Sequence, residues 1–539
     1  MLNRCSHVMA ALTAAAVVAA GCQDTSSSPS AAAVAKLADK DPKVVTEALD
    51  SLRKLKAKDA VPQIIPQLKS ENGNVREAAA AALEDLGDPQ AVQPLIDAYD
   101  LATSDKAIVR ANSKISDALG TLGDRRATPA LLKVLQTRDD LLRVHAVEAL
   151  GKLKDPSSTP ALVRLVSDDG MPPLIVKFAI IALGDIGAPD AIPPLLKALV
   201  MERNGISFFV EASYGLFQIG SPAVPALSAL VAGTDKEYAA WAESQNRLPG
   251  GYVSKAAIVL ADIGDPSAIP VLIKALKWED AGGKEALTNL VRGTVAEALG
   301  RLRAADAAAP MSAMYGSVED ARVRGQFGVA LAHINDKKVL PKLEAAVKNV
   351  KDPWPDRQEA IAALALLGDA KEKPVFDAVQ KVETVEKALK ECLAEESDDS
   401  ADAKKEKCQK AADARVKFLA DQVALLMVAD GCKEDAACWA GKLKDANPKI
   451  RERAAYQLGE LGSAGSIDAL VEACKDQSTY VRRAAYIALD WLTRVDAVKP
   501  ALKAKYDVLA AQLDAEKSSA ITQIVNEDLR RVVWKLHKS

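Results

Sequence analysis

The residue types that most often carry out acid–base or metal chemistry are few and scattered in this chain. Its 539 residues include four histidines, His7, His145, His333 and His537, and none of them belongs to a His-Glu pair. A metal centre needs several His, Cys or carboxylate ligands brought together, which this spacing does not predict. The Gly-x-Ser-x-Gly, P-loop and dinucleotide-binding patterns do not occur. We therefore expect no enzyme activity, no cofactor and no metal.

One cysteine near the start of the chain has a chemical role that its neighbours predict. Arg4 precedes an apolar run, Val8 to Ala20, that is too short for a permanent membrane span. The run ends in Val-Val-Ala-Ala-Gly-Cys22 and resembles a bacterial lipoprotein signal, in which a peptidase cuts before a cysteine that is then lipidated. An ordinary secretory signal cut nearby, or a short membrane anchor, is the alternative. We expect several acyl chains on Cys22 to hold the protein to a membrane. Gln23 is not the Asp that favours inner-membrane retention, so the outer membrane is preferred.

Two further cysteines predict a disulfide across a helical hairpin. Residues 371–396 and 401–429 read as two prolonged helices that meet at a polar tip. Cys392 and Cys408 lie at nearly equal distances from that tip, so they would face each other across it. Disulfides persist in the oxidising compartments that an exported protein meets. We expect this hairpin to project from the body of the protein.

The remaining cysteines allow more than one arrangement. Cys432 and Cys438 are close enough in sequence to form a local disulfide. Cys474 is then left over, on a predicted helix. Pairing of Cys474 with Cys432 or Cys438 is the competing arrangement.

A repeated helical pattern contains most of these positions. Thirteen helical segments close on a Leu, Ile or Val that is usually followed by Gly and Asp. Successive closures lie 31 to 44 residues apart, except for one interval of 61. A period in the low thirties predicts stacked helical hairpins, because one hairpin is too small to bury its apolar face alone. The closing residues are Leu55, Leu86, Leu122, Leu153, Ile186, Ile219, Ile263, Leu302, Ile334, Leu367, Val428, Leu461 and Leu492.

Residues 59–87 show how one repeat is built. The first helix spans 59–68 and has Pro62 in its first turn, where the missing N–H costs little. The second helix spans 75–86, and Gly87 suits the cap at its C-terminus. The sequences from Val75 to Gly87 and from Val481 to Leu489 resemble HEAT repeats of the bacterial, lyase-like type.

This resemblance covers about residues 36–495. It implies an all-α fold, an alpha-alpha superhelix (a HEAT/armadillo-like solenoid) of about 13 helical-hairpin repeats. It also implies that the second helices line the concave side. It is specific for fold and not for function.

An arginine stands ten residues before the closing residue in seven of the thirteen repeats. Carboxylates such as Asp445 and Asp476 often precede it. This spacing predicts a ladder of Asp–Arg pairs between successive turns. The arginines are Arg76, Arg143, Arg292, Arg324, Arg357, Arg451 and Arg482.

Aromatic residues gather where insertions lengthen the period. Eight of the 22 aromatic residues fall between positions 201 and 278, beside the extra segments 234–252 and 279–284. Insertions on one edge of a solenoid often form its binding face, and Tyr and Trp are favoured contact residues. A local core at a bend in the superhelix is the alternative reading. The residues that we expect to bind a partner are Phe209, Tyr238, Trp241 and Tyr252.

Composition narrows the class of partner. The net charge is −3, from 70 basic and 73 acidic residues, so no large basic field favours nucleic acid. We expect a lipid-anchored scaffold in the cell envelope that binds a protein or peptide partner. The alternative is an enzyme or enzyme accessory of the HEAT-like lyase type. The chain then divides into a signal peptide (1–21), lipidated Cys22 and a polar tether (22–35), a HEAT array (36–370), an elongated repeat (371–430), further HEAT repeats (431–495) and a C-terminal helical cap (496–539).

Overall fold

The protein folds almost entirely into short α-helices. The computed structural model describes residues 28–350, 352–395, 400–516 and 523–538, so Cys22 and the polar tip of the predicted hairpin lie outside the described residues. The described chain contains helices α1 to α31 and one pair of two-residue strands. It forms two compact units, residues 1–153 and 154–539. This boundary falls inside the array that the sequence predicts as continuous.

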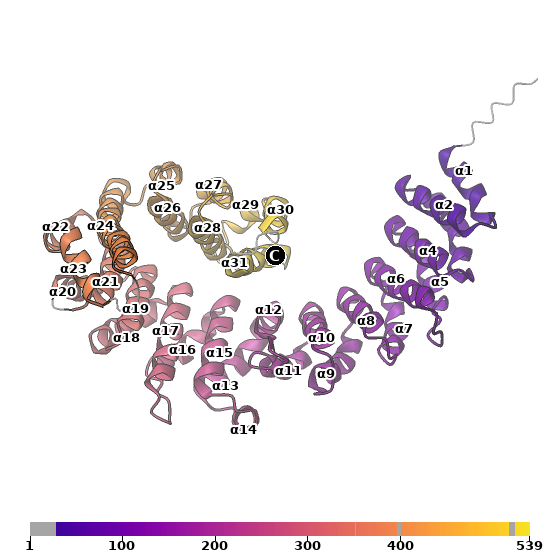
Figure 1. The fold of residues 1–539 in the computed structure, drawn as a ribbon, viewed down its shortest axis with the longest axis horizontal. Helices are drawn as coiled ribbons and strands as arrows, with labels where there is room; N and C mark the ends of the chain where they lie inside the picture. Colours follow the sequence, from indigo (N-terminus) through magenta and orange to yellow (C-terminus); the bar gives the residue numbers. More distant parts are fainter. Residues whose placement is uncertain (1–27, 351, 396–399, 517–522, 539) are drawn as a thin grey trace, which may run out of the picture. The chain divides into compact units, whose positions relative to one another are not determined.

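The first unit contains four helical pairs in sequence, and each pair packs on the next (Figure 1). Its helices are α1 (Pro29–Ala35), α2 (Pro42–Lys54), α3 (Val61–Ile64), α4 (Gly73–Leu86), α5 (Val92–Asp97), α6 (Lys106–Leu122), α7 (Thr128–Val134) and α8 (Asp140–Leu153).

The second unit continues the same alternation and then adds longer elements. Its first part contains α9 (Thr159–Ser167), α10 (Pro173–Ile186), α11 (Ile192–Ala198), β1 (Glu202–Arg203), β2 (Ile206–Ser207), α12 (Phe209–Ile219), α13 (Val224–Ala232), α14 (Lys236–Ser244), α15 (Pro249–Ile263), α16 (Ile269–Ala275), α17 (Glu285–Arg301), α18 (Ala308–Met314), α19 (Ala321–Ile334), α20 (Leu340–Lys348) and α21 (Trp354–Leu367). Its last part contains α22 (Lys373–Val382), α23 (Val385–Glu395), α24 (Ala401–Cys432), α25 (Ala436–Lys442), α26 (Pro448–Leu461), α27 (Ile467–Ala473), α28 (Thr479–Leu492), α29 (Lys499–Lys503), α30 (Tyr506–Glu516) and α31 (Gln523–Lys538).

The repeat boundaries follow from the sequence pattern. Ten of the thirteen second helices end at the predicted closing residue, as α4 does at Leu86. Gly87 then adopts a φ of 65°, a left-handed cap that costs a residue without Cβ little. Asp88 starts the next repeat by accepting a hydrogen bond from the Gln90 backbone N–H. The all-α fold class and the repeated helical pair are therefore as predicted.

The repeated arginine has a different role from the one that the spacing predicts. Arg76 Nε donates to the Ser70 carbonyl, and an Arg482 guanidinium nitrogen donates to the Asp476 carbonyl at 2.9 Å. Both carbonyls lie where the first helix of the same repeat ends, so the arginine caps that helix. The predicted pair between successive repeats forms where Arg451 binds the Asp476 carboxylate at 2.7 and 2.9 Å. The predicted Asp–Arg pair is thus a local feature. The more general role of the repeated arginine is to donate hydrogen bonds to carbonyl groups that the end of the first helix leaves unpaired.

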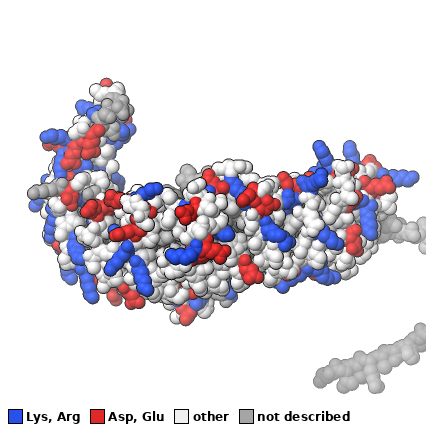
Figure 2. All heavy atoms as spheres, turned by 90° about the horizontal axis from the view of Figure 1, so that it is seen from below, with Lys and Arg blue, Asp and Glu red and all other residues white. Residues whose placement is uncertain are grey.

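The predicted hairpin is present, but its first arm is broken. The sequence predicts one helix over 371–396, whereas α22 ends at Val382 and α23 begins at Val385. The break occurs at Glu383, whose carboxylate is 1% exposed and pairs with Arg357 at 2.5 Å and Arg415 at 3.0 Å. A buried acidic side chain requires such partners, and reaching them interrupts the helix. Figure 2 shows the hairpin of α23 and α24 standing out at the upper left, and elsewhere on this face acidic and basic side chains are interspersed.

The structure joins four of the cysteines in two disulfides. Cys392 on α23 is bonded to Cys408 on α24, with Cα atoms 5.5 Å apart. Cys432 is bonded to Cys438 at the turn between α24 and α25. Cys474 is buried and belongs to neither disulfide, so the competing pairing does not occur, and its thiol donates to the Leu470 carbonyl.

The second unit folds back on itself. The inner helices α28 and α31 approach the inner helices α12, α15 and α17, far earlier in the chain (Figure 1). Trp491 Nε1 donates to the Arg301 carbonyl at 3.0 Å. Asp262, with a side chain that is 0% exposed, binds Arg301 at 2.7 Å and Arg531 at 2.9 Å. One buried carboxylate therefore joins α15, α17 and α31.

This closure turns polar side chains of the C-terminal cap inward. Val532 and Leu536 are buried. Asp528 and Arg531 are also buried, at 7% and 9% exposure, and they face the ion network rather than solvent.

Among the described residues, no single helix is long and apolar enough to cross a membrane. One pair of helices, Phe209–Ile219 with Ser221–Ala232, has the length and composition of a membrane span, but the two are bent by 111° relative to each other.

Candidate partner-binding site

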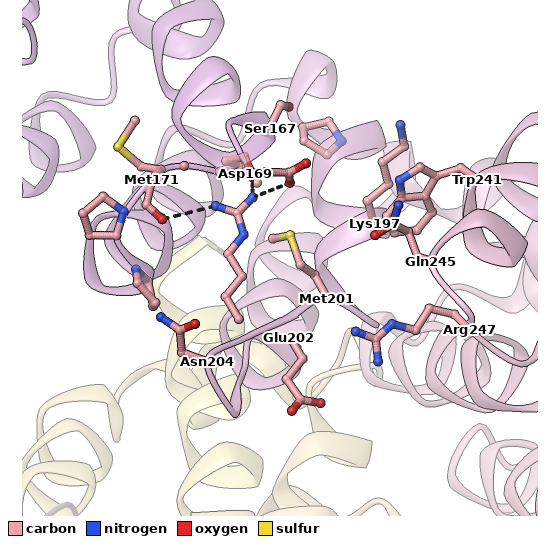
Figure 3. A pocket seen from close by; sticks show the side chains of 16 residues that line it. Ser167, Asp169, Met171, Lys197, Met201, Glu202, Asn204, Trp241, Gln245 and Arg247 are labelled. Atoms are coloured by element: carbon pink, nitrogen blue, oxygen red, sulfur yellow. Dashed lines mark hydrogen bonds and ion pairs between the residues drawn. The ribbon is translucent and has the colours of Figure 1, made fainter.

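A cavity of about 590 Å³ opens where the α14 insertion meets the edge of the second unit (Figure 3). Its walls come from the turn between α9 and α10, from α11, from the β1–β2 hairpin and from α14 with the turn that follows it. These are loop ends and inserted elements, the parts of a solenoid where repeats diverge.

Arg203 holds one wall in place. The β1–β2 hairpin turns through Asn204 and Gly205, both with positive φ, as a tight two-residue hairpin requires. The turn directs the Arg203 guanidinium toward the end of α9, where it donates to the carbonyls of Asp168 at 2.6 Å and Val166 at 2.9 Å. These hydrogen bonds fix the β1–β2 hairpin to the α9–α10 turn. The guanidinium of Arg203 is therefore already engaged within the protein.

Trp241 forms the opposite wall. It is half-buried on α14, and the Lys197 ammonium lies 5.2 Å from its ring centroid. An ammonium over an indole face is attracted to the ring quadrupole, by about 0.5–1 kcal/mol at a partly exposed site. Figure 3 shows Trp241, Lys197 and Gln245 together on one side of the cavity, with Arg247 below them. This wall offers an aromatic surface beside two cations.

Tyr238 and Tyr252 do not reach this surface, which corrects the expectation that they contact a partner. They are 4% and 7% exposed, and their ring centroids are 5.2 Å apart. The Tyr238 hydroxyl donates to the Leu196 carbonyl at 3.1 Å, and burial raises the pKa of this phenol above its ordinary value. Their role is to anchor α14 on α11 and α15, as the alternative reading proposed.

Phe209 lies outside the cavity lining. Its ring is half-buried beneath the Lys255 ammonium, which is 5.0 Å from the centroid and donates to the Leu199 carbonyl at 2.8 Å. Burial lowers the pKa of Lys255, and the nearby Arg247 lowers it further. Of the four aromatic residues that the sequence singles out, only Trp241 lines the cavity.

The lining of the cavity carries charges of both signs. Lys197 and Arg247 present cations, whereas Asp169 and Glu202 are exposed at the rim. No His or Cys lines the cavity. Sequence analysis did not identify Lys197 and Arg247, because lysines and arginines are common on helix surfaces. Only the fold brings these two residues into one cavity with Trp241.

One group in the first unit has side chains suited to a metal, and the sequence did not predict it. Asp117 on α6 and His145 and Glu148 on α8 place their ligand atoms within 4.8 Å of one another. His145 Nδ1 is 2.7 Å from an Asp117 oxygen, and this contact raises the pKa of His145. Lys114 lies 4.0 Å from the other Asp117 oxygen and places a positive charge beside the group. A neighbouring cation opposes metal binding, so we interpret the group as an ion-pair cluster.

The chain has distant similarities to several proteins of known structure. The sequence matches no curated protein. Among solved structures it is similar to yeast importin-beta (Kap95p), at 12% identity over 93% of this chain and 71% of that chain, with a TM-score of 0.40. It is similar to human deoxyhypusine hydroxylase at 22% identity over 52% of this chain and 98% of that chain, with a TM-score of 0.23. It is also similar to the complex of CpcE and CpcF of phycocyanin lyase from Nostoc sp. PCC7120, at 21% identity over 59% and 98%, with a TM-score of 0.24.

The match to family models covers more than half of the chain. Residues 30–116, 100–175, 284–365 and 440–522 match the model of HEAT repeats, and residues 177–200 and 254–277 match the PBS lyase HEAT-like repeat. The matched segments lie in both compact units. The chain belongs to the HEAT-repeat family.

Proposed function

We propose that the protein is a non-catalytic scaffold, tethered to a membrane through Cys22, that binds a protein partner with the cavity beside α14. The observation that carries the proposal is the wall formed by Trp241 and Arg247 of the α14 insertion together with Lys197 of α11, because the repeat does not need this insertion. Trp and Arg are enriched among the residues that dominate binding energy at protein interfaces. A partner that covers the half-buried indole of Trp241 would remove its remaining contact with water. The cations Lys197 and Arg247 would favour a partner segment that is acidic or rich in carbonyl groups.

The proposed location rests on the sequence of the first 35 residues. A lipobox-like end at Cys22 and a polar tether would leave the folded body free to reach a partner in the cell envelope, at the periplasmic face of the outer membrane. The two disulfides support a compartment outside the cytoplasm, because disulfides are rare where thiols are kept reduced.

A capture experiment with matched variants tests the proposed function. Envelope proteins are purified with the wild-type scaffold, with Trp241→Ala and with Arg247→Ala. Lys236→Ala serves as the control, because Lys236 is exposed on the same helix and does not line the cavity. A central aromatic residue contributes about 2 kcal/mol or more, so one stoichiometric partner should be retained by wild type and Lys236→Ala and lost by about 30-fold in Trp241→Ala. Equal retention by all variants, with unchanged melting, contradicts the proposal.

A further inference from the structure

A second cavity, of about 490 Å³, lies in the second unit where the C-terminal helix meets the ends of α12 and α15. It is separate from the cavity beside α14, because α12 begins near one cavity and its last residues line the other. Its apolar floor includes Phe217, Ile263 and Trp534.

The lining of this cavity carries cations and no carboxylates. Four basic residues line it, and no Asp or Glu does. Asp265, nearby, is occupied as the cap of the following helix and in a hydrogen bond with Ser221. The basic residues are Arg494, Lys499, Lys535 and Lys538.

Behind the lining, one buried carboxylate serves two of these cations. Asp490 binds Lys535 at 2.5 Å through one oxygen and Arg494 at 2.6 Å through the other. Although burial opposes ionisation, the two cations hold the pKa of Asp490 below its usual range. Burial also lowers the pKa of Lys535, against the attraction of Asp490. Arg494 and Lys535 thus share one carboxylate as their counter-ion, which leaves a net positive charge beside the cavity.

The arginine retains an unused donor. Arg494 Nε is buried and has no hydrogen-bond partner. Its guanidinium packs against Gly264, where a Cβ would lie 3.2 Å from the guanidinium carbon. Gly264 has a φ of 78°, so the backbone conformation also requires a residue without a side chain here. The guanidinium is thus held in place against the backbone, and its positive charge stays at the wall of the cavity.

The other two lysines can exchange their partners. Lys499 pairs with Asp496, which is 93% exposed, and such a pair contributes little. Lys538 lies with its ammonium 5.2 Å from the Trp534 ring centroid. Both side chains are therefore available to an anion that enters over the apolar floor.

We propose that this cavity binds a carboxylate attached to an apolar group. Lys499 and Lys538 pair with the carboxylate, the positive charges of Arg494 and Lys535 add to the attraction, and Phe217 and Trp534 receive the apolar group. The carboxylate belongs either to an acidic peptide segment or to a small free carboxylic acid. The site does not depend on the cavity beside α14, so either proposal can fail alone.

Fluorine NMR of the full chain labelled with 5-fluorotryptophan tests this site. The Trp534 resonance is assigned by its loss in Trp534→Phe. The probes are the peptide acetyl-Ala-Phe-Glu-Glu, its Gln-Gln amide, benzoate and inorganic phosphate. The acidic peptide or benzoate should shift the Trp534 resonance with saturation, and the amide should not.

The variants distinguish a built site from general charge. Lys499→Gln with Lys538→Gln should weaken binding about tenfold, as the loss of charge-assisted hydrogen bonds predicts. Lys503→Gln, on the same short helix and outside the lining, should leave binding unchanged. A shift with the peptide identifies a peptide segment, and a shift with benzoate alone identifies a small acid. No saturable shift, a shift with phosphate alone, or equal binding by the double variant overturns the proposal.

Discussion

Replacing Asp262 by asparagine should release the C-terminal helix α31 from the inner face of the second unit. The Asp262 carboxylate is 0% exposed and lies 2.7 Å from Arg301 and 2.9 Å from Arg531, whose side chains are 20% and 11% exposed. The substitution removes the anion and leaves two guanidinium groups facing each other. Asp528, at 3.8 Å from Arg301 and 3.4 Å from Arg531, is too distant to replace it fully.

The expected loss follows from leaving buried charges without a partner. Removing one member of a buried ion group costs about 3–5 kcal/mol. Such a loss raises the population of the opened state by roughly 100-fold or more. Opening should be confined at first to α31, because the remaining helices keep their repeat contacts.

Hydrogen exchange followed by mass spectrometry measures this opening directly. Peptides that cover 523–538 should exchange much faster in Asp262→Asn than in wild type, while peptides from α4 and α6 should not change. Asp190→Asn is the control, because Asp190 is exposed. Unchanged protection of α31 in Asp262→Asn would refute the conclusion that this carboxylate fastens the helix.

Three further predictions concern the tether, a disulfide and a buried acid. Mass spectrometry of the mature protein should find an acylated N-terminus at Cys22, and Cys22→Ser should release the protein from membranes; an unmodified residue 22 in the wild type contradicts the tether. Cys392→Ser with Cys408→Ser should destabilise the hairpin by about 3 kcal/mol, because the bond closes a loop of about 16 residues; equal proteolysis of α23 and α24 in variant and wild type would argue against this. Burial raises the pKa of Glu460 to about 7 from its usual 4.5, so the folded state holds a proton that the unfolded state has lost. This carboxyl therefore lowers the free energy of unfolding as pH rises from 4.5 to 7, by up to about 3 kcal/mol. Glu460→Gln should gain stability relative to wild type at pH 8 but not at pH 4.5, as denaturant titrations would show, and a gain independent of pH would contradict the shift.

The repeats could be predicted because each boundary depends on local chemistry. A closing Leu or Ile, a left-handed Gly87 and a capping Asp88 act within a few residues, so the period alone places helix ends such as Leu86. The break at Glu383 could not be predicted, because a glutamate in a helical pattern normally faces solvent. Only the fold places Arg357 and Arg415 around it.

Contacts between residues far apart in the sequence could not be predicted for a related reason. Asp262 and Arg531 are far apart in the sequence, and each reads alone as an ordinary polar helix position. The site was predicted in part: the aromatic cluster indicated the α14 insertion and Trp241. Neither the burial of Tyr238 nor the approach of Lys197 is encoded in spacing, because both depend on how α14 packs on α11.

The measurement that tests the account most directly is photo-crosslinking in intact cells from position 245, at the exposed edge of the cavity beside α14. A benzoylphenylalanine at this position should give one dominant protein adduct, which Trp241→Ala abolishes. The same probe at Lys274, exposed on α16, should give none. An absence of adducts at 245, or an adduct that persists undiminished in Trp241→Ala, would contradict the conclusion that this edge of the solenoid binds a partner.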